Sequence, residues 1–314
     1  MAACGGKHRR ALRRALIALT ALVLLLSLCI TAAPRLDPNT SLPGWSRIFS
    51  AAGLLPGQPE GESVHVLNVG QGTAVLVISG GHAMLVDAGP GADGGRTVTR
   101  YLRQMGVERL DLVIATHAHE DHIGALSAVV QKFPVERLVM SQTRPEAEED
   151  AAAYDRVRNA CADRGITPTA PRAGMRYTVG GFAVELLYAD AAAAEENNRS
   201  AVTRITDGKS VLLLMGDAEQ PVEEALITSG TDLRADILVA GHHGSKTSTT
   251  SAFLQAVRPG YVVFSAGEDN SFGHPAPEVL DRAQDCGARC LRTDVNGTVV
   301  FRLWDGKRTL ETEW

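Results

Sequence analysis

The sequence predicts an α/β fold in which two β-sheets pack together with helices on the outside of both. Short apolar runs of β-type residues recur along the chain, and amphipathic helical patterns lie between many of them. The early runs follow one another as hairpins, around turns such as Gly80-Gly81, whereas the later runs alternate with helices. This mixed order fits two sheets covered by helices. Polar clusters recur at the ends of the runs, where an open α/β architecture collects its ligands.

The elements follow in order from these patterns. Strands are predicted at residues 64–69, 74–78, 83–86, 110–115, 137–140, 182–188, 201–205, 210–215, 236–240, 261–265, 289–292 and 298–303. Helices are predicted at residues 96–105, 124–132, 146–164, 219–229, 249–257 and 277–286. A catalytic domain over residues 63–314 therefore contains all of the predicted sheet residues.

The N-terminal residues predict export. Residues 1–14 carry five basic and no acidic side chains, and an uncharged apolar stretch follows over residues 15–34. This order is typical of a signal peptide or a signal anchor. We expect an extracytoplasmic protein, either secreted or anchored to the membrane by residues 15–34, and the sequence leaves the cleavage open. Residues 35–62 are rich in Pro, Gly and Ser and are predicted to form a linker.

Charge and cysteine content narrow the classes of function. Of the 31 basic residues, five lie in residues 1–14, which leaves 26 against 36 acidic residues. Such an acidic body disfavours tight, sequence-blind binding of long polynucleotides, although it does not exclude a nuclease whose metal ions supply positive charge. Cys161, Cys286 and Cys290 fall in the globular part. An odd number predicts no disulfide framework and leaves one bridge open.

The segment Thr116-His117-Ala118-His119-Glu120-Asp121-His122 carries the strongest functional signal. It follows a predicted buried strand and precedes a predicted helix. Alternate residues of an extended chain point the same way, so His117 and His119 are expected to share one ion. Asp121 and His122 lie where the chain turns into the helix and are expected to face a second ion. Surface histidines of a polar loop are the alternative, but the chain has only nine histidines in all.

Two further strand ends carry metal-ligand chemistry. Asp217 follows the apolar run at residues 211–214, and its two oxygens suit a position between two ions. The alternative is that Asp217 caps the next helix. His242 and His243 follow another strand, with one expected as a ligand and the other beside the substrate. Imidazole and carboxylate ligands suit Zn²⁺ and related divalent ions.

The loops beyond these strands contain candidates for substrate binding. Ser245 and Lys246, followed by Thr247, Ser248 and Thr249, offer hydroxyls, an ammonium and backbone N–H groups at a predicted helix start. They are candidates for a phosphate cradle, although Ser and Thr before a helix are also ordinary caps. His274 follows another strand end, where it could bind phosphate or donate a proton.

Taken together, these segments resemble the metallo-β-lactamase superfamily, and within it the branch similar to the hydrolase domain of the DNA-uptake competence protein ComEC. The resemblance rests on residues 68–72, 85–89, 116–122, 197–200, 216–217, 242–245, 272–275 and 292–294. It implies an αββα sandwich that holds two divalent ions, Zn²⁺ or Mn²⁺, between its sheets. The implied ligands are His117, His119, Asp121, His122, Asp217 and one of His242 or His243. Asp87 is implied to be a buried carboxylate under the site.

Three departures from the family pattern bear on function. Asn68 and Thr73 stand where relatives often have aspartates, and residues 197–200 read Asn-Asn-Arg-Ser where many members place another ligand histidine. The missing histidine speaks against a β-lactamase or a glyoxalase-type thioesterase. Proteins of the ComEC type also carry many membrane-spanning helices, whereas this chain has one such stretch at most, so separate DNA-uptake machinery is the expected partner.

We therefore predict a metal-dependent hydrolase, most consistent with a phosphodiesterase acting on nucleic acid or a small phosphodiester. Asp121 would bind an ion or hold the proton of the attacking water, while Lys246, Asn198 and His274 would stabilise developing charge. His274 is the better candidate to protonate the leaving oxygen. One alternative is a small-ester hydrolase acting on a phosphorylcholine ester or a lactone. Another is a non-catalytic accessory that binds DNA or the envelope.

Overall fold

The computed structural model describes residues 61–304 and 307–313, together with Thr20, Leu25 and Ser27. The predicted N-terminal apolar helix and nearly all of the predicted linker lie outside these residues, so both stay predictions. Among the residues described, no helix is long and apolar enough to cross a membrane.

Two seven-stranded sheets form the centre of the fold. The first sheet runs, in spatial order, through β14 (Lys307–Thr312), β13 (Val299–Trp304), β1 (Glu62–Val66), β2 (Val75–Ser79), β3 (His82–Val86), β4 (Leu112–Ile114) and β5 (Leu138–Val139). Its strands pair antiparallel from β14 to β3 and parallel from β3 to β5. The carboxyl ends of β3 and β4 therefore lie at one edge of the sheet.

The second sheet follows the same plan. Its spatial order is β12 (Arg289–Arg292), β11 (Tyr261–Phe264), β10 (Ile237–Val239), β9 (Val211–Leu214), β8 (Val202–Thr206), β7 (Phe182–Tyr188) and β6 (Arg176–Val179). Pairing is antiparallel from β6 to β9 and parallel from β9 to β12. Parallel pairing brings the carboxyl ends of β9, β10 and β11 together at one edge.

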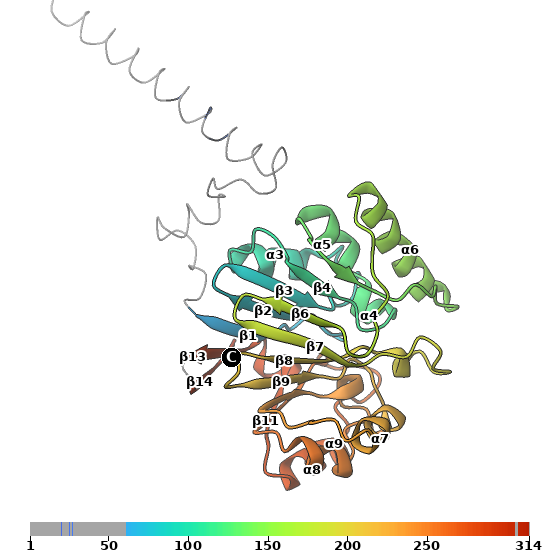
Figure 1. Cartoon of the computed structure of the whole chain (residues 1–314), viewed down its shortest axis with the longest axis vertical. Helices are drawn as coiled ribbons and strands as arrows, with labels where there is room; N and C mark the ends of the chain where they lie inside the picture. The colour runs from blue at the N-terminus through green and yellow to red at the C-terminus, as the bar shows by residue number, and fades with distance from the viewer. Residues whose placement is uncertain (1–19, 21–24, 26, 28–60, 305–306, 314) are drawn as a thin grey trace, which may run out of the picture. The chain divides into compact units, whose positions relative to one another are not determined.

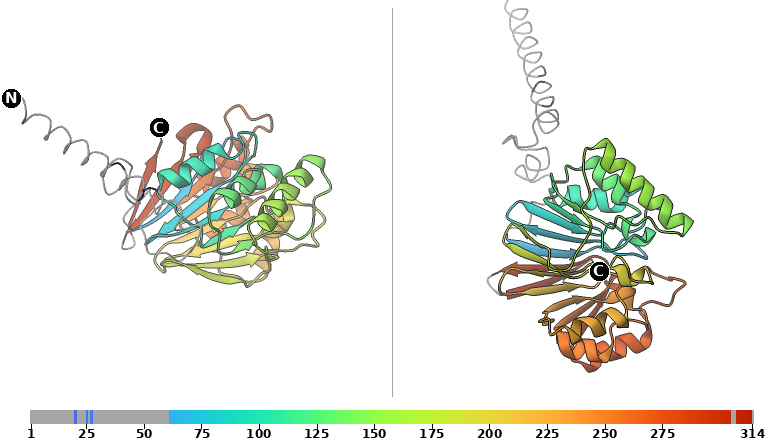
Figure 2. Two further views of the ribbon diagram at one scale, coloured as in Figure 1. Left: turned by 90° about the horizontal axis from the view of Figure 1, so that it is seen from above. Right: turned by 45° about the vertical axis from the view of Figure 1, so that its right-hand side comes forward.

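Helices cover the outer faces of both sheets (Figures 1 and 2). The first sheet is covered by α3 (Arg96–Gln104), α4 (Glu120–Ile123), α5 (Leu126–Lys132) and α6 (Glu148–Asp163). The second is covered by α7 (Gln220–Thr228), α8 (Ser251–Val257) and α9 (Pro277–Asp285). Shorter turns of helix lie at η1 (Asn197–Arg199), η2 (Gly241–Gly244) and α10 (Thr293–Asn296). The described chain is an αββα sandwich, as the resemblance implied.

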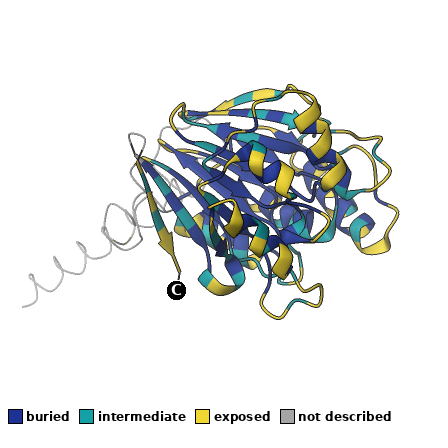
Figure 3. Ribbon diagram, turned by 90° about the horizontal axis from the view of Figure 1, so that it is seen from below, coloured by how far each residue is buried: buried dark blue, intermediate teal, exposed yellow. Residues whose placement is uncertain are grey.

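Strand periodicity explains how the layers pack. In β2, Val75 and Val77 face a core between the two sheets, whereas Leu76 and Ile78 pack under the helices. Both faces of the central strands are buried, while the helices expose their outer sides to solvent (Figure 3). Burial of both faces is why these strands read as continuous apolar runs in the sequence.

Three connections at the site edge are tied together by backbone hydrogen bonds. The Thr73 N–H donates to the carbonyl of Asp121, the Ala88 N–H to that of His122, and the Gly89 N–H to that of Thr73. Gly72 lies so close to this junction, at φ 146°, that an added Cβ would stand 2.3 Å from the Asp121 carbonyl oxygen. The loop at residues 68–74 therefore supports the start of α4.

The structure differs from the predicted elements mainly at edges and ends. The strands β6 and β14 were not predicted, because their side chains are largely exposed and show no apolar run. The helix predicted at residues 124–132 corresponds to α5, which begins two residues later at Leu126, and the short helix α4 before it was not predicted. In the part of the chain that the structure describes, Cys161, Cys286 and Cys290 are unpaired thiols.

Candidate metal centre

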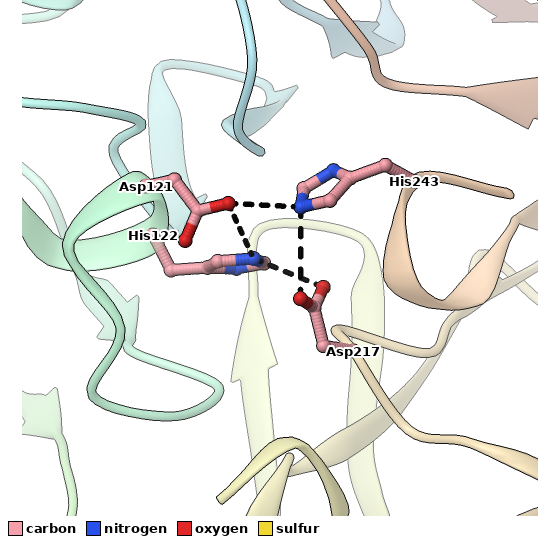
Figure 4. Close-up of side chains that lie close together, drawn as sticks. All are labelled: Asp121, His122, Asp217 and His243. Atoms are coloured by element: carbon pink, nitrogen blue, oxygen red, sulfur yellow. Dashed lines mark hydrogen bonds and ion pairs between the residues drawn. The ribbon is translucent and has the colours of Figure 1, made fainter. Parts of the chain in front are cut away.

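The histidine and aspartate side chains predicted as ligands converge where both sheets present the ends of parallel strands. Asp121 and His122 occupy the first turn of α4, Asp217 follows β9, and His243 lies in η2 just after β10. Figure 4 shows these four side chains pointing toward a common centre. The convergence follows from topology, because parallel strands release their next residues at the same edge.

One group of candidate ligands consists of Asp121, His122, Asp217 and His243, whose donor atoms all lie within 4.8 Å of one another. The Nε2 atom of His243 is 3.0 Å from Oδ2 of Asp121 and 3.6 Å from Oδ2 of Asp217. The Nε2 atom of His122 lies 3.0 Å from Oδ1 of Asp217. Two carboxylates and two imidazoles at this spacing make a donor set suited to one divalent ion.

A second group consists of His117, His119 and the same Asp217. Nε2 of His117 lies 3.0 Å from Nδ1 of His119 and 3.8 Å from Oδ2 of Asp217. Because Asp217 belongs to both groups, its carboxylate stands between two candidate ion positions. This is the arrangement predicted from the sequence.

The histidines that face the centre are held by hydrogen bonds on their other ring nitrogen. Nδ1 of His122 donates to Oδ2 of Asp87 at 2.8 Å, and Nδ1 of His243 donates to the Ser265 carbonyl at 2.8 Å. Nδ1 of His117 lies 3.1 Å from the Thr116 hydroxyl. A proton on Nδ1 leaves Nε2 as the lone-pair nitrogen, which is the form that binds a metal.

Unpartnered atoms show that these residues fit metal ions. Nε2 of His122 and Oδ1 of Asp217 are buried and have no hydrogen-bond partner, although they lie 3.0 Å apart. Buried polar atoms are normally satisfied, here either by a proton on Nε2 that is donated to Oδ1 or by a cation that both atoms coordinate. A divalent cation coordinated by both atoms satisfies this requirement.

The charges of the cluster also favour a cation. Burial lowers the pKa of His122, but Asp217, Asp87 and Asp121 outweigh it and raise the pKa well above the usual value. Burial likewise opposes ionisation of Asp121, yet His122 and the hydrogen bond from His243 hold its pKa below the usual range. The carboxylates thus remain ionised and attract positive charge to the centre, and a bound metal would compete with protons for the imidazoles.

Asp217 does not cap α7, so the alternative interpretation of this residue is wrong. The helix begins at Gln220 after Glu219, and no side chain accepts a capping hydrogen bond there. Asp217 is 2% exposed, and its backbone N–H donates to the Ser200 hydroxyl at 2.9 Å. The turn therefore directs the Asp217 carboxylate into the centre rather than toward the helix.

The two adjacent histidines separate into different positions. His243 belongs to the first donor group, whereas His242 belongs to neither. Nδ1 of His242 lies 3.1 Å from a carboxylate oxygen of Glu219, and its Nε2 is 3.9 Å from Oδ2 of Asp217. Both residues have left-handed backbone conformations, with φ 47° and 54°, which non-glycine residues seldom adopt. His242 thus stands beside the ligands, oriented by Glu219.

Some of the predicted substrate groups have other contacts. The amide oxygen of Asn198 accepts a hydrogen bond from the Glu219 N–H at 3.0 Å. The buried Glu223 carboxylate accepts from the backbone N–H groups of Thr249 and Thr250. Because Glu223 binds the Thr249 N–H, this member of the predicted phosphate cradle is not available to a substrate.

The other cradle candidates remain near the centre. Ser245 is buried, with its hydroxyl 2.9 Å from that of Thr247, and Lys246 is exposed. The helix that follows is capped by Thr250, whose hydroxyl accepts from the Phe253 N–H. Ser245 and Lys246 therefore do not cap α8, and their part in substrate binding stays a prediction.

His274 lies next to the ligand histidines. Its ring stacks against that of His243 with centroids 6.4 Å apart, and against that of Phe272 at 5.8 Å. Burial, together with His242 and His243, lowers the pKa of His274 to about 4. Its Nδ1 atom is buried without a hydrogen-bond partner among the described residues.

Several residues of the centre were not singled out by sequence reasoning. Thr116, Ser265, Glu219 and Phe272 orient or flank the predicted ligands. Each stands within two residues of a predicted ligand or strand end, and Thr116 and Phe272 also lie in segments that carry the family resemblance. Neither signal shows which of the neighbouring loop residues contacts a ligand.

Comparison with known proteins agrees with this geometry. Residues 67–268 match the family model of the metallo-β-lactamase superfamily. The chain is 32% identical to the competence protein ComA of Neisseria gonorrhoeae over 291 residues, covering 90% of this chain and 39% of that protein. It is 30% identical to ComE operon protein 3 of Bacillus subtilis over 261 residues, covering 77% of this chain and 33% of that protein. The chain thus spans well under half of the length of these relatives.

Solved structures show the same fold. Igni18, a metallo hydrolase from the archaeon Ignicoccus hospitalis, superposes with a TM-score of 0.52 at 18% identity, covering 77% of this chain and all of that one. YhfI from Bacillus subtilis, a metallo-β-lactamase fold protein, gives a TM-score of 0.51 at 14% identity and covers 76% of this chain and 99% of that one. The fold, the family match and the identity to competence proteins confirm the predicted resemblance, and the chain belongs to the metallo-β-lactamase superfamily.

Proposed function

We propose that this protein is a dinuclear metal-dependent phosphodiesterase that acts outside the cytoplasm on nucleic acid or another phosphodiester. The observation that carries the proposal is the shared carboxylate: Asp217 joins the His117 and His119 group to the group of Asp121, His122 and His243. Two adjacent ions suit in-line displacement at phosphorus, because they acidify the attacking water and neutralise charge on the attacking and leaving oxygens.

The protein's own side chains supply the remaining chemistry. Asp121 is the more exposed carboxylate of the first donor group, with 31% of its side chain accessible, so it is placed to accept a hydrogen bond from the attacking water and orient it. The exposed ammonium of Lys246 offers positive charge for a phosphoryl oxygen.

In this proposal His274 donates a hydrogen bond to the substrate. With a pKa of about 4, its ring is neutral near pH 7. A neutral imidazole stabilises a phosphoryl oxygen through its N–H group. This favours charge stabilisation over the predicted role of delivering a proton from the imidazolium to the leaving oxygen.

Location and substrate are proposed from the sequence and from relatives. Residues 15–34 form the proposed signal peptide or anchor, which would place the centre on the outer side of the membrane. Two relatives carry names that refer to competence and to the ComE operon, which supports DNA as the substrate and separate uptake machinery as the partner. Zn²⁺ and Mn²⁺ are the proposed ions.

The test is hydrolysis by the full chain, stripped with a chelator and then supplied with Mn²⁺ or Zn²⁺. Bis-p-nitrophenyl phosphate and single-stranded DNA are the two substrates, and Asp217→Asn is the inactive control. Metal-dependent cleavage of both establishes a phosphodiesterase and supports a nuclease. Cleavage of the small diester alone points to a small phosphodiester substrate. If the metal-loaded wild type cleaves neither substrate, the proposal is overturned, and a small-ester hydrolase or a non-catalytic accessory that binds DNA or the envelope is favoured.

A further inference from the structure

One aromatic side chain stands exposed beside the metal centre. Among the residues that the structure describes, four large apolar side chains are exposed, and Phe272 is both the only aromatic and the most exposed of them, at 68%. Scattered apolar residues on a surface need no explanation by themselves. The position of Phe272 relative to the ligands is what gives its exposure meaning.

Stacked rings connect Phe272 to the centre. Its ring lies 5.8 Å from that of His274 at an interplanar angle of 24°. The His274 ring lies 6.4 Å from that of His243 at 26°. His243 is a member of the first donor group. The three rings therefore form a row from the surface to the ligands, and Phe272 is the outermost of them.

The loop that carries Phe272 is held in place from within. The Asn270 amide donates to the carbonyls of Gly267 and His274 at 2.9 and 2.6 Å, and its oxygen accepts from the His274 N–H at 3.0 Å. The Gly267 N–H in turn donates to the Gln71 amide oxygen at 3.1 Å. A loop held in this way needs little ordering of its backbone when a ligand stacks on the Phe272 ring.

A free positive charge lies on the neighbouring segment. Lys246 is exposed and has no hydrogen-bond or ion-pair partner within the described part of the chain. Its segment packs against that of His274, since the Ala276 N–H donates to the Gly244 carbonyl at 2.9 Å. An ammonium for phosphate and an aromatic face for a base are the two elements by which proteins bind single-stranded nucleic acid.

We propose that Phe272 is a stacking platform for a nucleobase of the strand whose phosphodiester lies at the metal centre. The inference rests on the proposed phosphodiesterase function and names its substrate class as a base-bearing single strand. The net charge of the chain supports it. At a formal charge of −5, the protein gains little from general attraction to phosphates, so contacts to bases must contribute to affinity.

The test compares two single-stranded oligonucleotides of equal length, one with all bases and one with abasic sites around the scissile position. The measured quantity is the ratio of kcat/KM for the base-bearing strand to that for the abasic strand. Phe272→Ala should lower this ratio by about 5-fold to 150-fold, mainly through KM, because one base–aromatic stack is lost. Phe272→Trp should restore it. Ile227→Ala, which removes an exposed apolar side chain from α7, should keep the wild-type ratio.

A binding measurement separates this inference from the proposed function. An oligonucleotide carrying 2-aminopurine is titrated with each variant of the full chain in the presence of a chelator, and quenching of its fluorescence reports stacking. Quenching by wild type and by Phe272→Trp but not by Phe272→Ala supports the platform, even if no strand is cleaved. An unchanged kcat/KM ratio, or equal quenching by wild type and Phe272→Ala, would overturn it while leaving phosphodiesterase activity intact.

Discussion

Replacing Asp87 with asparagine should weaken one metal position and leave the other in place. The Asp87 carboxylate is fully buried and accepts three hydrogen bonds of 2.8 Å, from the backbone N–H and the hydroxyl of Thr116 and from Nδ1 of His122. Its backbone is left-handed, with φ 58°, a conformation that asparagine tolerates well. The substitution therefore changes one oxygen to an NH₂ group without disturbing the turn.

The magnitude follows from the three bonds. An amide at this position has only one oxygen, so at least one of the three donors loses its acceptor. Losing a hydrogen bond to a charged acceptor costs about 1.5–3 kcal/mol of the free energy of unfolding. If the His122 bond is lost, the ring is free to carry its proton on Nε2, the atom that faces Asp217. Loss of such a supporting bond lowers metal affinity by about 10-fold to 100-fold.

The assay is calorimetric titration of the chelator-stripped full chain with Zn²⁺ or Mn²⁺, paired with chemical denaturation in a chelator. Asp111→Asn is the matched control. Asp111 is also buried and accepts a hydrogen bond from the Ala83 N–H at 3.0 Å, but it lies just before β4, whereas the ligand segment follows the end of that strand. Both variants should lose stability, and only Asp87→Asn should lose affinity at one of two sites. Equal metal affinities in wild type and Asp87→Asn would refute the supporting role of Asp87. An equal loss of metal affinity in Asp87→Asn and Asp111→Asn would refute it as well.

Three further predictions address the shared ligand, the support of α4 and a buried histidine. Asp217→Ala and His119→Ala should both abolish turnover while the fold persists. Elemental analysis should find no bound metal in Asp217→Ala and one ion per chain in His119→Ala. Two ions in Asp217→Ala would contradict the shared carboxylate. Gly72→Ala should lower the free energy of unfolding by at least about 1 kcal/mol, and with it the melting temperature, because the added Cβ would meet the Asp121 carbonyl oxygen. An unchanged melting curve would argue against this close approach. Burial lowers the pKa of His65 to about 3, so its neutral form stabilises the fold above the unfolded pKa of 6.5, and this contribution is lost as pH falls toward 3. Between pH 7 and pH 5, denaturation should show wild type losing about 2 kcal/mol more stability than His65→Gln, and parallel losses would exclude the effect.

Local patterns in the sequence were sufficient to predict most of the sheet and the ligand types. Strands buried on both faces, such as β2 and β9, give continuous apolar runs, because every side chain faces a core. The exposed edge strands β6 and β14 give no such run, since backbone pairing with a neighbouring strand holds them in the sheet. Hydrophobic periodicity records burial, so it misses elements that are held mainly by backbone hydrogen bonds.

The sequence by itself determined that His117, His119, Asp121, His122 and Asp217 stand at strand ends with metal-binding chemistry. Only the tertiary structure decided which of the paired histidines joins them, because the contact between His243 and Asp121 links residues 122 positions apart. The same holds for Glu223, which binds the Thr249 N–H, one of the groups that the sequence offers for a phosphate cradle. Spacing along the chain shows which side chains share a face of one element. The distance between atoms on different elements is set only when the sheets pack, and metal coordination depends on that distance.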